Sequence, residues 1–153
     1  MSDSDLMSLY SGRILALTTM IPHQGRLSAP QAHTQKRAPL CGSVVSVDLS
    51  LRDGRIAEFA QEVQACALGQ AAAAILGQAV IGRSPAEIRA LRDSLAAMLS
   101  DGGPVPPAPF AEYEVLIPAR DFKNRHASIL LAVEATLEAA EKAAEKTAEK
   151  TRA

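Results

Sequence analysis

The stretch "SVVSVDLSLRDGRIAEFAQEVQA", residues 43–65, decides the fold because it predicts two antiparallel strands joined by a tight turn. In the first strand, apolar residues alternate with polar ones, Val45, Val47, Leu49 and Leu51 with Ser46, Asp48 and Ser50. This alternation predicts one buried and one solvated face. Asp53-Gly54 is typical of a type I′ turn, which needs positive φ at both central residues. The second strand runs from Arg55 to about Ala65, with Ala57, Phe59 and Val63 on one face and Ile56 and Ala60 on the other.

An isolated hairpin is marginally stable in water, so a third strand or covering helices are required. Residues 112–117, "EYEVLI", are the best candidate for that strand, and residues 22–40 are interpreted as a loop or an irregular edge strand. Apolar periodicity predicts helices at 5–20, 67–82 and 84–99 and from about 121 onward, with a linker at 101–110. The sequence therefore predicts the α+β class, with a small antiparallel sheet of two to three strands and helices packed on one of its faces.

The chain has 153 residues, enough for one domain, which we place at residues 1–140. Residues 141–153 are rich in Ala, Glu and Lys and are expected to form an exposed helical tail. A net charge of −1 gives no electrostatic argument for a nucleic acid or membrane partner. With two cysteines and no secretory signal, the chain is expected to be soluble and cytoplasmic, with reduced thiols.

The predicted hairpin brings two distant cysteines to one end of the sheet. Cys41 precedes the first strand and Cys66 follows the second, so antiparallel pairing brings both to the same end of the sheet. Cys66 also opens a predicted helix, whose N-terminal N–H groups favour a thiolate. His126 lies early in the last helix and completes three ligands if that helix begins at the same end. Two thiolates and an imidazole suit zinc or iron.

The same three residues also have a structural interpretation. Free cysteine commonly behaves as a small buried hydrophobe. His126 shares an apolar helix stripe with Leu130, Val133 and Leu137, where a lone histidine is often a hydrogen-bonded core residue. The chain contains neither a CxxC nor an HExxH motif. Spacing alone therefore leaves both interpretations open.

Residues 40–76, "LCGSVVSVDLSLRDGRIAEFAQEVQACALGQAAAAIL", resemble the U-type iron–sulfur cluster assembly scaffold family. That family shows Cys-Gly-Asp before a hairpin, a second cysteine opening a helix, and a third cysteine in the last helix. "LYSGRILALTTMIPHQGRLSAP" at 9–30 and "RHASILLAVEATLEA" at 125–139 are similar to its N-terminal helix and its third-cysteine segment. The insertion between Cys66 and His126 resembles the Suf branch.

The resemblance assigns residues one by one and also shows departures. Cys41 and Cys66 match the first two family cysteines, and His126 matches the histidine that precedes the third. Ser43 replaces the family's aspartate, and a hydroxyl is a weaker ligand than a carboxylate. Ala127 replaces the third cysteine and cannot ligate a metal. "IPARDFKNR" at 117–125 replaces the segment that a chaperone recognises in the Isc branch.

The resemblance implies a non-enzymatic scaffold or carrier that binds iron or an iron–sulfur cluster through Cys41, Cys66 and His126, with Ser43 as a weak ligand. The missing fourth ligand is expected to be water, a partner's thiol or Cys41 of a second protomer. Cys41, in its Pro/Gly context, is the candidate acceptor of sulfur from a cysteine desulfurase. Downstream apo-proteins would receive the product. The chain is expected to be a monomer or a weak dimer.

Two alternatives come from other functional classes. With the third cysteine and the aspartate lost, the chain is alternatively a degenerate member that binds zinc or acts only as an interaction or regulatory module. A thiol enzyme with Cys66 as nucleophile and His126 as base is the other. No acid that would orient His126 stands at a recognisable place.

Overall fold

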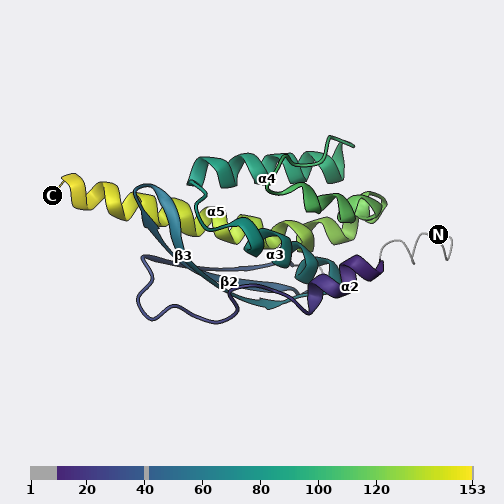
Figure 1. Cartoon of the computed structure of the whole chain (residues 1–153), viewed down its shortest axis with the longest axis horizontal. Coiled ribbons are helices and arrows are strands. Elements are labelled where there is room, and N and C mark those ends of the chain that lie inside the picture. Colours follow the sequence, from purple (N-terminus) through teal and green to yellow (C-terminus); the bar gives the residue numbers. More distant parts are fainter. Residues whose placement is uncertain (1–9, 40–41, 153) are drawn as a thin grey trace.

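The computed structural model describes residues 10–39 and 42–152 of the chain (Figure 1). Its elements, in order, are α2 (Gly12–Thr18), β1 (Ala32–Arg37), β2 (Val44–Arg52), β3 (Arg55–Gln64), α3 (Ala67–Ala79), α4 (Pro85–Ser100), the 3₁₀ helix η1 (Ala111–Asp121) and α5 (Lys123–Arg152). The strands form one antiparallel sheet in the order β1-β2-β3. The predicted α+β class, with helices on one face of a three-stranded sheet, is confirmed (Figure 1).

The third strand is not the one predicted. Residues 112–117 belong to η1, because the buried side chains of this segment, Tyr113, Leu116 and Ala119, recur every third residue, as a 3₁₀ helix requires. The third strand is β1, at the end of the segment interpreted as a loop or irregular edge. There the buried Ala32 and Thr34 alternate with exposed residues in the period of two that a strand needs.

The hairpin at the centre of the prediction is confirmed. Asp53 and Gly54 have φ values of 54° and 76°, so both central residues of the turn are left-handed. One detail was wrong. The register shifts between Ser50 and Leu51, which places Ile56 opposite Leu51 and turns Ile56 into the core instead of onto the polar face.

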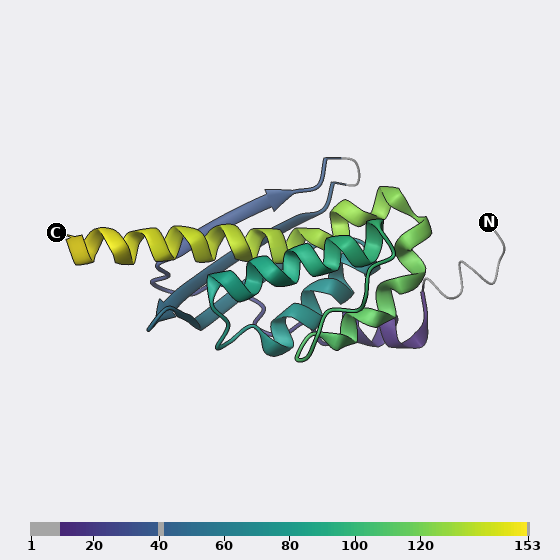
Figure 2. The same ribbon diagram turned by 90° about the horizontal axis from the view of Figure 1, so that it is seen from above.

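The helices form two layers on the sheet. α5 packs against β1 and β2 while α3 lies beside it, and α4 and η1 cover these two helices from outside (Figures 1 and 2). Because α3 has neighbours on several sides, it is buried almost all round from Leu68 to Gly77, and its alanines allow the close approach. The predicted capping box of α4, Ser84 with Glu87, is present.

α5 runs without interruption through the segment predicted to be an exposed tail. Arg89 of α4 is paired with Glu141 at 2.8 Å, and Lys146 donates to the backbone oxygen of Gln31. Ala143 is fully buried. The N-terminal helix predicted for residues 5–20 is described from Gly12, as α2. Within residues 10–39 and 42–152, no helix has the length and hydropathy to cross a bilayer.

The second face of the sheet is not the solvated face predicted for β2. Residues 22–31, which we call the strap, begin beside β3 at the bridge between Gln24 and Gln61 and end at the start of β1. The strap covers Asp48, whose side chain is only 1% exposed. Ser46 and Ser50 are also buried. The alternation of β2 therefore separates an apolar core face from a polar covered face.

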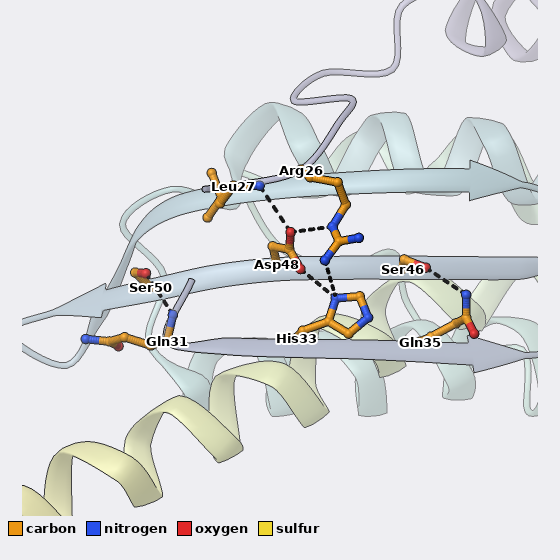
Figure 3. A network of polar contacts seen from close by, with 8 residues as sticks. All are labelled: Arg26, Leu27, Gln31, His33, Gln35, Ser46, Asp48 and Ser50. Atoms are coloured by element: carbon orange, nitrogen blue, oxygen red, sulfur yellow. Dashed lines mark hydrogen bonds and ion pairs between the residues drawn. The ribbon is translucent and has the colours of Figure 1, made fainter. Parts of the chain in front are cut away.

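Asp48 holds the strap to the sheet (Figure 3). Its Oδ2 accepts hydrogen bonds from Arg26 Nε at 2.7 Å and from the backbone N–H of Leu27 at 3.1 Å. Its Oδ1 accepts from His33 Nδ1 of β1 at 2.6 Å. Burial raises the pKa of the Asp48 carboxyl, but the hydrogen bonds from Arg26 and His33 outweigh burial, so the pKa lies below its usual value.

Candidate functional site

Four elements, β2, β3, α3 and α5, meet at the end of the sheet opposite the Asp53-Gly54 turn. Val44 pairs with Gln64, so the start of β2 and the end of β3 lie side by side, as the hairpin predicts. Cys66 follows β3 and is the N-cap residue of α3. The first turns of α5 close the same end of the sheet from its helical side (Figure 2).

Three side chains from these elements form a connected cluster. Ser128 of α5 places its Oγ 3.5 Å from the sulfur of Cys66 and 3.1 Å from the Oγ of Ser43. Ser128 is 1% exposed and Ser43 is 3% exposed, whereas Cys66 is half-buried. We call Ser43, Cys66 and Ser128 the Ser-Ser-Cys cluster. It joins the sulfur of a half-buried cysteine to two buried hydroxyl groups.

Gly69, in the first turn of α3, makes this cluster possible. A Cβ at this position would lie 2.6 Å from Ser128 Oγ and 2.8 Å from the Cβ of Ala65. Neither distance is compatible with ordinary van der Waals contact. A side chain at position 69 would therefore displace the Ser128 hydroxyl from the space between the two helices.

The surroundings of Cys66 favour its thiolate form. Burial raises the pKa of the thiol, but the hydrogen bond with Ser128 lowers it. The Cys66 side chain makes no regular capping hydrogen bond to α3. The backbone N–H groups of Gly69 and Leu68 nevertheless lower the pKa of the thiol, and the positive charge of Arg125 lowers it as well. The net result is a pKa below that of an ordinary cysteine, so the sulfur is a better nucleophile and metal ligand.

His126 lies on α5 near the cluster in sequence, but its ring has other partners. Nε2 is 3.0 Å from the carbonyl oxygen of Ala119 and 3.1 Å from that of Arg120. Because carbonyl oxygens only accept, Nε2 carries the proton and donates to the end of η1. Ligation through Nε2 would require these bonds to break, and the α5 side chain within hydrogen-bonding distance of Cys66 in the described structure is Ser128.

The remaining predicted site residues have different outcomes. Ser43 lies in the cluster, and Ala127, which precedes Ser128 on α5, is exposed. Cys41 lies outside the residues that the structure describes, so its predicted pairing with Cys66 stays a prediction. Across 10–39 and 42–152, no three His, Cys, Asp or Glu side chains come together in a way that would hold a metal ion.

Ser128 is the site residue that the sequence interpretation missed. Ser128, Leu131, Ala132 and Ala135 are all buried, at the spacing of one helix stripe. A hydroxyl among apolar residues on a buried stripe requires a partner, and this signal was available in "RHASILLAVEA". The partner itself was not predictable, because it depends on the close approach of α3 at Gly69.

Known proteins are similar to this chain in both sequence and structure. The model of the NifU-like N-terminal domain matches residues 9–128. The iron–sulfur cluster assembly scaffold protein IscU of Streptococcus pyogenes serotype M1 is 28% identical over 135 residues, 88% of this chain and 84% of that protein.

Two solved structures extend the comparison. The N-terminal part of a nitrogen-fixing NifU-like protein from Brucella abortus has a TM-score of 0.90 and 40% identity, covering 93% of this chain and 99% of that chain. The SufU protein of the thermophile Fervidobacterium islandicum AW-1 shares the fold at 17% identity, with a TM-score of 0.77 over 86% of this chain and 96% of that one. Because the family model spans most of the chain and the Brucella structure nearly all of it, the chain belongs to the family of NifU-like N-terminal domains.

Proposed function

We propose that this protein is a scaffold or carrier in iron–sulfur cluster assembly, which holds iron or a cluster at the end of the sheet where Cys66 lies. The observation that carries the proposal is the Cys66 sulfur, presented half-buried at a helix N-terminus with its pKa lowered. Cysteine thiolates are the usual ligands of iron–sulfur clusters. Membership of the NifU-like family supports the same assignment.

Cys41 is proposed as the second thiolate and as the acceptor of sulfur. It is joined to Ser43 of the cluster through Gly42 alone. In this proposal the Cys41 thiolate attacks the outer sulfur of a persulfide on a cysteine desulfurase, and the desulfurase thiolate leaves. The chain is then a cytoplasmic carrier of sulfur and iron and not an enzyme, and apo-proteins are its acceptors.

The ligand set is proposed to be incomplete in one chain. The described residues fit an iron–sulfur cargo in the kind of donor, a thiolate, but Cys66 is the one cysteine among them. His126 is a ligand only if it releases the carbonyl groups of η1, and Ser43 supplies a weak oxygen donor. A partner's thiol, or Cys41 of a second copy, is proposed to complete the set. Incomplete ligation suits a protein that passes its cargo on.

A zinc-binding or purely interacting module is the second candidate. The observations that favour it are Ser43 and Ala127 at positions where the family carries ligands, together with the commitment of His126 Nε2 to backbone carbonyls. A single tetrahedral zinc ion needs fewer thiolates than a cluster does.

Anaerobic addition of iron and sulfide to the full chain distinguishes the two candidates. The scaffold proposal expects visible sulfur-to-iron charge-transfer absorption, with iron and sulfide retained by the protein after desalting. If metal analysis finds stoichiometric zinc in the protein and the protein stays colourless after iron and sulfide are added, the zinc module is supported. Retention of neither metal would leave the interaction module and would reject the scaffold.

Restoring the missing thiolate is a second test. Ala127 is exposed on α5, next to Ser128, so a longer side chain is tolerated there. We expect Ala127→Cys to hold iron roughly 100-fold more tightly than the natural chain. This assumes that one added thiolate contributes about a quarter of the metal-binding free energy of a four-ligand site. The measurement is competition with a chelator, with Ala127→Ser as the control. Equal affinity in all three proteins would show that position 127 does not face the metal.

A further inference from the structure

We propose that Ser128 is the positioning residue of Cys66: its hydroxyl donates a hydrogen bond to the Cys66 sulfur and holds it at the end of the sheet. Nothing in the sequence comparison assigns this role. The inference rests on the proposed function in one respect. The expected effect of Ser128 is on the electron density of the Cys66 sulfur when that sulfur binds a metal.

The contacts of Ser128 give its hydroxyl a defined direction. Ser128 Oγ lies within hydrogen-bonding distance of both Cys66 Sγ, at 3.5 Å, and Ser43 Oγ, at 3.1 Å. A thiolate, or a sulfur bound to metal, can only accept, so Ser128 donates to it and accepts from the hydroxyl of Ser43. The resulting chain runs from Ser43 through Ser128 to the sulfur.

The scaffold fixes Ser128 in place. It is 1% exposed, and α5 packs against α3, α4, β1 and β2, so the hydroxyl cannot move away without disturbing the core. Gly69 supplies the space in which the hydroxyl sits. A side chain held by packing and by a second hydrogen bond is what positions a metal ligand accurately.

A hydrogen bond to a thiolate withdraws electron density from the sulfur. Such bonds are among the factors that set the reduction potentials of iron–sulfur clusters. Loss of a group that orients a metal ligand commonly costs 10- to 100-fold in metal affinity. Ser128 is therefore expected to act on the metal through Cys66, without ligating the metal itself.

Cobalt(II) alone is a suitable probe, because its thiolate charge-transfer band reports on the sulfur. We expect Ser128→Ala to bind Co²⁺ about 10- to 100-fold more weakly, with the band shifted to lower energy, since the sulfur lone pairs are no longer stabilised. Gly69→Ala should produce the same shift, because its Cβ displaces the hydroxyl. If Gly69→Ala does not fold, the test of the inference rests on the cobalt band of Ser128→Ala.

Thr136→Ala is the matched control. Thr136 is a fully buried hydroxyl on the same helix, and it donates to the carbonyl of Ala132 within α5. Removing the Thr136 hydroxyl should cost about as much stability as removing the Ser128 hydroxyl, but it does not affect the contacts of Cys66. The cobalt band of Thr136→Ala should therefore keep the energy that it has in the natural chain. The same band energy in Ser128→Ala and the natural chain would overturn the inference.

A cross-link tests the geometry without metal. In a Cys41→Ser background, Ser128→Cys should form a disulfide with Cys66 when diamide takes up the two electrons and two protons, because the two side-chain ends are 3.5 Å apart. Thr136→Cys should not. Absence of the 66–128 disulfide contradicts the inference whatever the metal does. A natural chain that takes up neither cobalt nor a cluster contradicts the proposed function, and the cross-link then decides the inference alone.

Discussion

Cys66→Ala is expected to lose the iron and sulfide that the natural chain retains after anaerobic assembly. Cys66 is the thiolate that the described structure places at the end of the sheet, and the two described side chains that form the cluster with it, Ser43 and Ser128, offer only hydroxyl groups. Removing one of four metal ligands costs about 3 kcal/mol, or roughly 100-fold in affinity. The measurement is iron and sulfide per chain, together with visible absorption.

The fold should survive this substitution, so that a loss of iron can be assigned to the missing thiolate and not to unfolding. The Cys66 side chain is half-buried, and its hydrogen bond with Ser128 is long, at 3.5 Å, so its loss should cost about 1 kcal/mol or less. Circular dichroism and the melting temperature confirm folding. Thr136→Ala serves again as a control that keeps its iron. A folded Cys66→Ala protein with undiminished iron would mean that the cargo is held elsewhere.

Asp48→Asn is expected to lower the stability of the chain by about 2–3 kcal/mol, because a buried carboxylate that accepts three hydrogen bonds becomes an amide that cannot satisfy all three donors. For a chain of this length the melting temperature should fall by about 4–12 °C. Asp101→Asn is the matched control, since Asp101 is exposed at the end of α4 and its change should stay within about 0.5 kcal/mol.

The effect of Asp48 should also depend on pH, in a direction that its pKa fixes. Arg26 and His33 hold the pKa of the folded-state carboxyl below its usual value. Its contribution is therefore complete above the unfolded-state pKa, about 3.9, and disappears as the pH falls through the lower folded-state value. The difference in stability between the natural chain and Asp48→Asn should be constant near neutral pH and should shrink below about pH 4. A difference that grows on acidification would contradict this assignment.

The hairpin and the α4 capping box were predictable because short sequence signals determine them locally. Asp53-Gly54 fixes the turn, and Ser84 with Glu87 fixes the helix start. The error at residues 112–117 has a different cause. Alternating Tyr, Val and Ile residues are typical of a strand, but burial every third residue against the helices favoured the 3₁₀ conformation of η1.

The site was predictable only in part. Pairing across the hairpin places Ser43 and Cys66 at one end of the sheet. The spacing predicted Cys41 and Cys66 there, and Cys41 lies outside the described residues. Which residue of α5 meets them depends on the rotation of that helix about its axis. Packing against α3, α4 and the sheet sets this rotation, and it turns Ser128 to the sulfur while His126 donates to the end of η1. The burial of Asp48 depends in the same way on the strap, whose path no local signal encodes.

Iron K-edge X-ray absorption of the assembled protein tests most directly whether the chain carries an iron–sulfur cargo on Cys66. The account predicts a shell of sulfur neighbours around iron in the natural chain and its loss in Cys66→Ala. Iron surrounded only by oxygen and nitrogen in the natural chain, or a sulfur shell unchanged in Cys66→Ala, would contradict it.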